Sequence, residues 1–261
     1  MIPLTHANFF PYETYRKEQQ DIIRLIELDA PLKKNILLVA PNGTGKTVIA
    51  LSALLPVAIE QDLKIIYLCR THTQTSRVIR ELRRIALKHP NGVAGLALRG
   101  RTQSCLHSTL LEFNPTPKEA MNMCQHFKIG SSCEYFQNLE KNRNVEQSLF
   151  KRYFNKPVDA EQLIEYCREM HFCPYYLTMY LLKFQHVIAC SFQWILNPQI
   201  RPYFLRYLGV DLNKCILVID ECHNVIDMAT QEHSHSLTFP FLIDCLENIP
   251  KMSELIRRNS L

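Results

Sequence analysis

The sequence predicts an α/β protein with a mostly parallel sheet, interrupted by a cysteine-rich and mainly helical insertion. Three observations support this prediction. Short apolar runs alternate with stretches of helical periodicity, a glycine-containing loop directly follows the first apolar run, and the alternation stops between about Gly100 and Leu182. Such alternation is typical of parallel strands joined by crossover helices. A chain of 261 residues, 47% of them apolar, is long enough to bury such a sheet.

Five runs are apolar on both faces, as covered parallel strands require. The strands are expected at residues 35–40, 64–69, 93–98, 186–190 and 215–220. Between them we expect helices, because apolar residues recur at helical spacing or because the segment directly follows a strand. The helices are expected at residues 15–29, 46–60 and 71–88.

Composition excludes several classes of protein. Every apolar run is interrupted by Lys, Asp or Gln well short of the roughly 18–20 residues that a bilayer span needs. The N-terminus lacks a basic segment followed by an apolar core and a cleavage site. We therefore expect no membrane span and no export, and cysteines that stay reduced rather than forming disulfides.

The net charge of +5 is mild, but its distribution is uneven. Eight Lys and Arg residues lie between Arg70 and Arg101 against a single acid, Glu81. This density suits a polyanion such as a nucleic-acid backbone. A solvated helix face explains the same charges, and both interpretations stay open at this point.

The segment APNGTGKT, residues 40–47, leads from the first expected strand into a helix. A loop of this kind turns backbone N–H groups toward an anion at a helix N-terminus, while its Lys reaches the β and γ phosphates and its Thr binds magnesium. The match covers the G-x-G-K-T end only, because Ala40 stands where the general pattern has glycine. A glycine-containing turn with an incidental lysine is the alternative. The predicted phosphate-binding residues are Asn42, Gly43, Thr44, Gly45, Lys46 and Thr47.

The segment DECH, residues 220–223, stands at the end of the last expected strand. An aspartate at the carboxyl end of a buried parallel strand lies at the ligand-binding edge of the sheet. Asp220 can hold magnesium together with Thr47, and Glu221 can orient or deprotonate the attacking water. The alternative is that the acidic pair caps the N-terminus of the following helix. Because the glycine loop and the acidic pair follow separate strands of the same kind of sheet, the two motifs together predict nucleotide hydrolysis.

Ten cysteines are present, and those in or beside apolar strands are explained as small buried hydrophobes. The insertion holds Cys105, Cys124, Cys133, Cys167 and Cys173. An insertion with a thin core commonly needs a metal or a cluster. No C-x-x-C pair specifies zinc, and a proline after a cysteine, as at Pro174, occurs at some iron–sulfur ligands. Spacing alone leaves a metal or cluster site and unligated thiols equally open.

Taken together, six segments resemble the N-terminal part of the XPD-like, iron–sulfur-containing DNA helicases of superfamily two. These are FPYETYRKEQ (10–19), GTGKT (43–47), IIYLCRTHTQ (65–74), GLALRGRTQSCLH (95–107), FCPYYL (172–177) and DECHN (220–224). The family reads DEAH where this chain reads DECH, so Cys222 is a departure that keeps a small residue.

The resemblance implies a RecA-like P-loop ATPase domain that binds ATP and Mg²⁺ and carries a four-iron four-sulfur cluster. Its ligands are expected to be Cys105, Cys124, Cys133 and Cys173. Cys167 is the rival for the last position, and Cys173 is preferred because only it has the family's CPY context. Arg16 and Gln19 resemble the adenine-side motif, with Gln20 as the alternative in a shifted register.

The resemblance also implies DNA contacts. Arg70, Thr71 and His72 are expected at the backbone of the tracking strand, and Arg99 and Arg101 near the duplex junction, where plain surface charges are the alternative. His223 is expected to couple the phosphate site to strand movement, with a helix cap as the alternative. For four aromatic residues we favour packing over stacking on bases. They are Tyr175, Tyr176, Phe192 and Trp194.

The expected domains are residues 1–102 and 183–229 for the ATPase domain, 103–182 for the iron–sulfur insertion, and 230–261 for the start of a truncated second insertion. Only 38 residues follow His223, too few for a second motor domain with its arginine finger. We therefore expect the nucleotide-binding half of a helicase, with negligible hydrolysis alone.

The expected partners are single-stranded and fork DNA, with a second motor domain or a larger repair or transcription complex. The expected location is the nucleus in a eukaryote or the cytoplasm in a prokaryote. Two competing hypotheses are a P-loop ATPase or kinase without a nucleic-acid role, and a zinc-binding interaction module.

Overall fold

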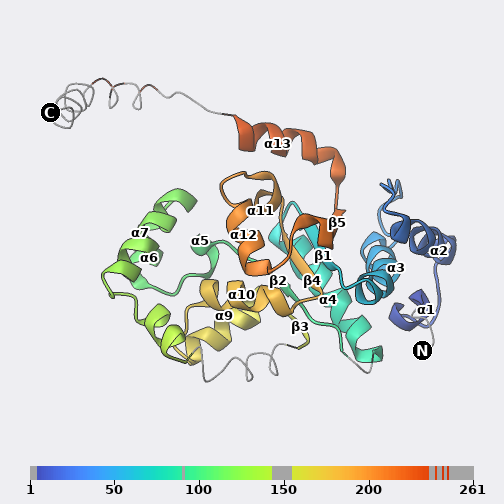
Figure 1. Ribbon diagram of the computed structural model, residues 1–261, viewed down its shortest axis with the longest axis horizontal. Coiled ribbons are helices and arrows are strands. Elements are labelled where there is room, and N and C mark those ends of the chain that lie inside the picture. The colour runs from blue at the N-terminus through green and yellow to red at the C-terminus, as the bar shows by residue number, and fades with distance from the viewer. Residues whose placement is uncertain are drawn as a thin grey trace.

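The computed structural model describes residues 5–89, 92–142 and 155–234, together with Phe239, Ile243 and Leu246. Within these residues, helices surround one five-stranded sheet (Figure 1). The sheet has the order β3-β2-β4-β1-β5, and all pairings are parallel. The strands are β1 Lys64–Cys69, β2 Gly95–Ala97, β3 Pro157–Val158, β4 Val187–Ser191 and β5 Cys215–Ile219. The predicted α/β class with a parallel sheet is confirmed.

The pairing of β1 with β5 sets the position of the acidic pair. Leu68 lies opposite Ile219, and the Asp220 N–H donates a hydrogen bond to the Leu68 carbonyl oxygen at 3.0 Å. The carboxyl ends of parallel strands meet at one edge of a sheet, which is where ligands bind in open α/β folds. Arg70 and Asp220 therefore leave neighbouring strands at that edge.

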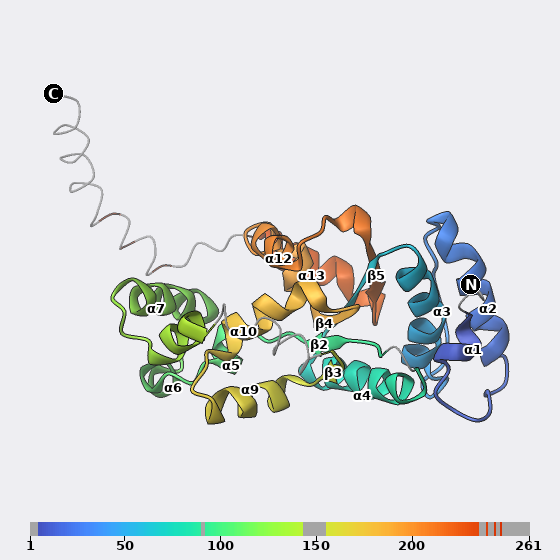
Figure 2. The same ribbon diagram turned by 60° about the horizontal axis from the view of Figure 1, so that its bottom comes forward.

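The central strand is buried on both faces, as the apolar runs predicted. Ile66 and Leu68 pack into the core on one face, while Ile65 and Tyr67 pack into the core on the other. The first face is covered by α9 Ala160–Glu169, α10 Pro174–Leu181, α11 Gln193–Leu196 and α12 Arg201–Leu208, and the second by α1 His6–Phe9, α2 Gln19–Asp29, α3 Lys46–Glu60 and α4 His72–Lys88. Figure 2 shows α4 and α12 on opposite sides of the sheet.

Helices α5 Arg101–Ser104, α6 Ser108–Phe113 and α7 Pro117–Ile129 lie across the sheet from α1 and α2 in both views (Figures 1 and 2). The stretch 103–182 was expected to hold no strand, and this is wrong, because β3 pairs with β2 at the sheet edge. A two-residue edge strand that begins with proline leaves almost no sequence signal. The domain boundaries themselves stay a prediction. The remaining elements are η1 Ala30–Leu32, η2 Leu182–Phe184, η3 Leu212–Lys214, η4 Cys222–Asn224 and α13 Val225–His233.

The expected strand at residues 35–40 is absent, although the segment lies within the described part of the chain. Its burial alternates as in a strand, with Leu38 half-buried against the α3 core and Leu37 and Val39 exposed. The expectation of a strand covered on both faces is therefore wrong here, since a strand also needs a hydrogen-bonded neighbour and no described strand lies beside this segment.

The expected helices are confirmed with small shifts. The helix at 46–60 is α3, and the helix at 71–88 is α4, whose N-cap Thr71 accepts a hydrogen bond from the Gln74 N–H. The helix at 15–29 begins only at Gln19, because Glu18 takes a left-handed backbone with φ 62°. Of the expected second insertion, the part beyond Ser234 falls almost wholly outside the described residues. No described helix is long and apolar enough to cross a membrane.

Two side-chain truncations test whether β1 is buried and whether the segment at residues 35–40 is exposed. Ile66→Ala should lower the free energy of unfolding by about 2–5 kcal/mol, because Ile66 is 0% exposed in the central strand. Val39→Ala should change it by about 0.5 kcal/mol or less, because Val39 is 87% exposed. Urea denaturation measures both. Equal losses would mean that residues 35–40 form a buried strand after all.

Candidate functional site

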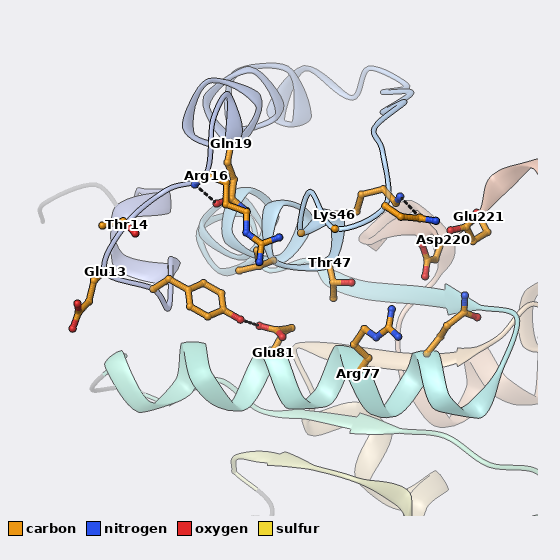
Figure 3. A pocket seen from close by; sticks show the side chains of 16 residues that line it. Glu13, Thr14, Arg16, Gln19, Lys46, Thr47, Arg77, Glu81, Asp220 and Glu221 are labelled. Atoms are coloured by element: carbon orange, nitrogen blue, oxygen red, sulfur yellow. Dashed lines mark hydrogen bonds between the residues drawn. The ribbon is translucent and has the colours of Figure 1, made fainter.

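A cavity of about 640 Å³ lies at the carboxyl edge of the sheet (Figure 3). It is enclosed by the segment before α2, the glycine loop with the start of α3, one face of α4 and the end of β5. The lining residues are Tyr12, Glu13, Thr14, Arg16, Gln19, Asn42, Gly43, Gly45, Lys46, Thr47, Val48, Gln74, Arg77, Glu81, Asp220 and Glu221. The fold thus brings together the glycine loop and the acidic pair, which are far apart in the sequence.

The glycine loop needs its two glycines. Gly43 and Gly45 both have φ +86°, a region that side chains with a Cβ rarely adopt. A Cβ on Gly45 would also lie 2.8 Å from Gln19 Nε2. Lys46 starts α3, and its Nζ donates hydrogen bonds to the Ala40 carbonyl oxygen at 3.1 Å and to Asn42 Oδ1 at 3.5 Å. The cavity is therefore bounded by a helix N-terminus, whose free N–H groups favour an anion.

Gln19 connects the glycine loop to the segment before α2. Its Oε1 accepts from the Arg16 backbone N–H at 3.1 Å, and its Nε2 donates to the Thr44 carbonyl oxygen at 3.2 Å. Gln19 is 2% exposed, so both bonds are shielded from water. The Arg16 side chain extends into the cavity (Figure 3). Gln20 does not line the cavity, so the geometry favours Gln19 over Gln20 as the residue on the adenine side.

The acidic pair lies across the cavity from the loop. Burial raises the pKa of Asp220, and the neighbouring Glu221 raises it further, while Lys46 and Arg77 lower it. A divalent cation beside Asp220 would favour its charged form again. Glu221 has φ 52°, a left-handed conformation that is uncommon for a residue other than glycine. Such strain is a feature of functional turns.

A chain of polar contacts runs from the acidic pair to the end of β1. His223 Nδ1 lies 3.5 Å from Glu221 Oε2, and its Nε2 lies 3.0 Å from Asn224 Nδ2. The Arg70 Nη1 donates to Asn224 Oδ1 at 3.3 Å. Arg70, Thr71 and His72 are exposed at the N-terminal end of α4. The contacts therefore link the cavity to an exposed basic end of the sheet.

Arg99 is buried and Arg101 is half-buried, so neither is an exposed surface charge of the kind expected near the duplex junction. Arg99 is 6% exposed and donates to Thr75 Oγ1 at 2.6 Å and to Glu161 Oε1 at 3.1 Å. The Arg101 guanidinium lies 4.0 Å from the centre of the Tyr175 ring, a cation–π contact. Their charges are used inside the fold, so counting charges along the sequence overstated the basic surface.

The packing interpretation of the four aromatic residues is confirmed. Their side chains are buried in the core on the α10 face of the sheet, and none is more than 7% exposed. They are Tyr175, Tyr176, Phe192 and Trp194.

Four cysteines of the insertion approach one another from different elements. Cys105 follows α5, Cys124 lies in α7, Cys133 precedes a helix that begins at residue 134, and Cys173 is the N-cap of α10. Burial raises the pKa of Cys105 to about 11 and that of Cys173 to about 12, and charge on the other cysteines of the group raises both further.

Cys167 lies apart from most of this group. It is buried in α9, burial raises its pKa, and the only thiol that adds to the rise is Cys173. Within the described ranges, no group of three or more His, Cys, Asp or Glu side chains is arranged to hold a metal ion. The four thiols thus converge without forming a closed set of metal ligands.

Sequence reasoning missed the face that α4 turns to the cavity. Gln74, Arg77 and Glu81 recur at helical spacing on this face, while the apolar residues of α4 pack in the core. That periodicity was a usable signal, but the stretch was judged by its charge alone. Tyr12 was missed too: its hydroxyl donates to Glu81 Oε2 at 2.7 Å and accepts from Arg84 Nη1 at 2.8 Å.

Comparison with known proteins places these features in one family. The DEAD_2 family model matches residues 67–242. The chain is similar to the human regulator of telomere elongation helicase 1, with 26% identity over 94% of this chain and 22% of that protein. It is also similar to the Saccharomyces cerevisiae general transcription and DNA repair factor IIH helicase subunit XPD/RAD3, with 28% identity over 88% of this chain and 31% of that protein.

A solved XPD helicase has the same fold, with a TM-score of 0.55 and 22% identity over 84% of this chain and 34% of that one. The chain thus spans about a fifth to a third of the length of the curated relatives it matches. Because the family model covers well over half of the chain, including the end of β1, the converging cysteines and the acidic pair, the chain belongs to the DEAD_2 family.

Proposed function

We propose that this chain is the nucleotide-binding part of an ATP-dependent DNA helicase of the XPD-like type. The observation that carries the proposal is that Lys46, Thr47, Asp220 and Glu221 line one cavity at the carboxyl edge of a parallel sheet. The curated relatives in human and yeast are named as helicases. Because the chain spans only part of them, the unwinding activity and its DNA substrate belong to the proposal.

Each cavity residue has a role that its chemistry suits. The N–H groups at the start of α3 and the Lys46 ammonium bind the β and γ phosphates. The Thr47 hydroxyl and the Asp220 carboxylate hold Mg²⁺, which when bound neutralises charge on the phosphates. Glu221 orients the attacking water. Arg16 and Gln19 lie toward the adenine side.

Efficient hydrolysis needs more than this cavity. An arginine finger typically raises turnover by about a thousandfold or more. In helicases of this type a second motor domain supplies it, so we propose that the isolated chain binds ATP and hydrolyses it negligibly. A second motor domain or a larger repair or transcription complex would be the partner. The location proposed is the nucleus of a eukaryote or the cytoplasm of a prokaryote.

The DNA contacts proposed are Arg70, Thr71 and His72, which are exposed where β1 ends. The contacts from Glu221 through His223 and Asn224 to Arg70 support a coupling role for His223. A change at the phosphate site would thereby reach the DNA-facing end of β1. Binding at a fork junction is the finer part of this proposal, and with Arg99 buried and Arg101 half-buried it rests on the family resemblance alone.

We also propose that Cys105, Cys124, Cys133 and Cys173 hold a four-iron four-sulfur cluster. Their convergence from separate elements supports it, and so does the burial that raises the pKa of Cys105 and of Cys173, because a bound cation would offset this cost of charging the two thiols. A bound metal would favour the thiolates, and it would tie α5, α7 and α10 together. Arg101, whose charge also acts on Cys105, would partly offset the negative charge of such a cluster.

Lys46→Ala should weaken binding of Mg·ATP about tenfold to a hundredfold, because it removes a charge-assisted contact worth about 1.5–3 kcal/mol. Fluorescence titration with a labelled nucleotide measures the affinity. Lys34→Ala is the matched control, since Lys34 pairs with Asp29 at 2.6 Å and lies outside the cavity. Unchanged binding by Lys46→Ala would contradict the proposal.

Protein purified without oxygen should be brown and contain iron and sulfide. Cys105→Ser should bleach it, because one of the four proposed ligands is lost. Cys167→Ser should leave the colour in place, since among the described cysteines Cys173 alone acts on the pKa of Cys167. Visible absorption and elemental analysis provide the readout. Colourless protein with stoichiometric zinc would support the zinc-binding module instead.

Arg70→Ala should weaken binding of single-stranded DNA and lower the slope of log affinity against log salt by about 0.7, the value for one lost phosphate contact. Fluorescence anisotropy at several salt concentrations measures both. Arg168→Ala is the control, because Arg168 is exposed in α9 and paired with Glu165. A wild-type chain that does not bind DNA would favour the ATPase without a nucleic-acid role.

A further inference from the structure

Arg77 is a cavity residue to which neither the sequence motifs nor the proposed mechanism assigns a role. It lies in α4, and its guanidinium extends from that helix toward Thr47 (Figure 3). Lys46 and Thr47 come from the opposite wall, at the start of α3. The cavity therefore has a basic side chain on each of two facing walls.

The guanidinium of Arg77 has no partner among the residues that the structure describes. Among the described residues it makes no hydrogen bond and no ion pair, whereas Arg83 donates to the Pro157 carbonyl oxygen at 3.2 Å and Arg84 to Glu81 Oε1 at 2.6 Å. Arg99 is bonded inside the fold, as described above. Of the arginines of α4, Arg77 is thus the one that faces the cavity with its donors unused.

The acids near Arg77 do not neutralise it. Glu81, one turn along the same face of α4, is occupied by the Tyr12 hydroxyl and by Arg84. The Arg77 charge acts on Asp220 at the end of β5 and on Cys69 at the end of β1, since it lowers the pKa of both. It therefore lies on the side of the cavity that Thr47 and Asp220 line, where the proposed magnesium would bind.

We propose that Arg77 binds the γ-phosphate of the nucleotide from the wall opposite Lys46 and makes the cavity select triphosphate over diphosphate. The inference rests on the proposed function, because it assumes a nucleotide with its phosphates against Lys46 and Mg²⁺ between Thr47 and Asp220. Mg²⁺ bridges the β- and γ-phosphates in such sites. A guanidinium beside the magnesium position reaches the outermost phosphate, and its planar set of donors suits phosphate oxygens.

The test compares two ligands on four proteins. The 261-residue chain and its Arg77→Gln, Arg77→Lys and Arg80→Gln variants are titrated calorimetrically, in Mg²⁺ and without DNA. The ligands are ADP and the non-hydrolysable ATP analogue adenylyl imidodiphosphate. Arg80 is the matched control, because it is an exposed arginine of the same helix that does not line the cavity.

Arg77→Gln should weaken binding of the triphosphate about tenfold and binding of ADP less than about twofold. Arg77→Lys should retain part of the preference, since it keeps the charge and loses the planar donors. Arg80→Gln should change neither affinity. Thermal unfolding without nucleotide should be the same for Arg77→Gln and wild type, because no contact within the described chain is lost.

Equal losses for both ligands, or no loss for either, would overturn the role of Arg77. A lowered unfolding temperature in Arg77→Gln would overturn it as well, since it would point to a structural role. The proposed function fails separately: a wild-type chain that binds neither ligand overturns both proposals. If Lys46→Ala weakens the binding of nucleotide to the wild-type chain and Arg77→Gln does not, only the proposed role of Arg77 is overturned.

Discussion

The parallel pairing of β5 with β1 is the constraint on which the candidate site depends. The register sets Leu68 opposite Ile219, and the next N–H, that of Asp220, still bonds to the Leu68 carbonyl oxygen. If β5 shifted by one residue along β1, every side chain of β5 would turn to the other face of the sheet. Asp220 would then leave the cavity, and Ile66 and Leu68 would face different neighbours. Core packing on both faces of β1 therefore holds the carboxylate in place.

The wall of the cavity that the glycine loop forms is held in place in a different way. The glycine loop does not follow a paired strand, so its position depends on α3, which is buried along most of its length, and on Gln19. Gly45 has to be glycine partly because Gln19 Nε2 occupies the space of a Cβ. A buried amide that bonds both to this loop and to the Arg16 backbone couples the proposed adenine side to the phosphate side. One substitution at Gln19 would disturb both.

Much of the fold was predictable from the sequence, because four of the five apolar runs form strands and the glycine loop does precede a helix. The run at residues 35–40 failed because an unbroken apolar run does not report whether a neighbouring strand is present to pair with it and help cover both faces. The site was predicted at its glycine loop and acidic pair, where unusual dihedrals and charged groups leave a local signature. Arg77 and Glu81 could not be found from charge alone, since only the helical phase separates them from Arg80 and Arg83 of the same helix.

The arginines between residues 70 and 101 differ in what their side chains contact. Arg99 is held under α4 by Thr75 and Glu161, Arg84 ties α4 to Tyr12, and Arg77 is left facing the cavity. A buried guanidinium must be paired, because an unpaired buried charge is costly, while one at a cavity can keep its donors for a ligand. The arginines of this region are therefore distinguished by their partners. Those with intramolecular partners stabilise the fold, and the one that lines the cavity without a partner is the one available to a phosphate.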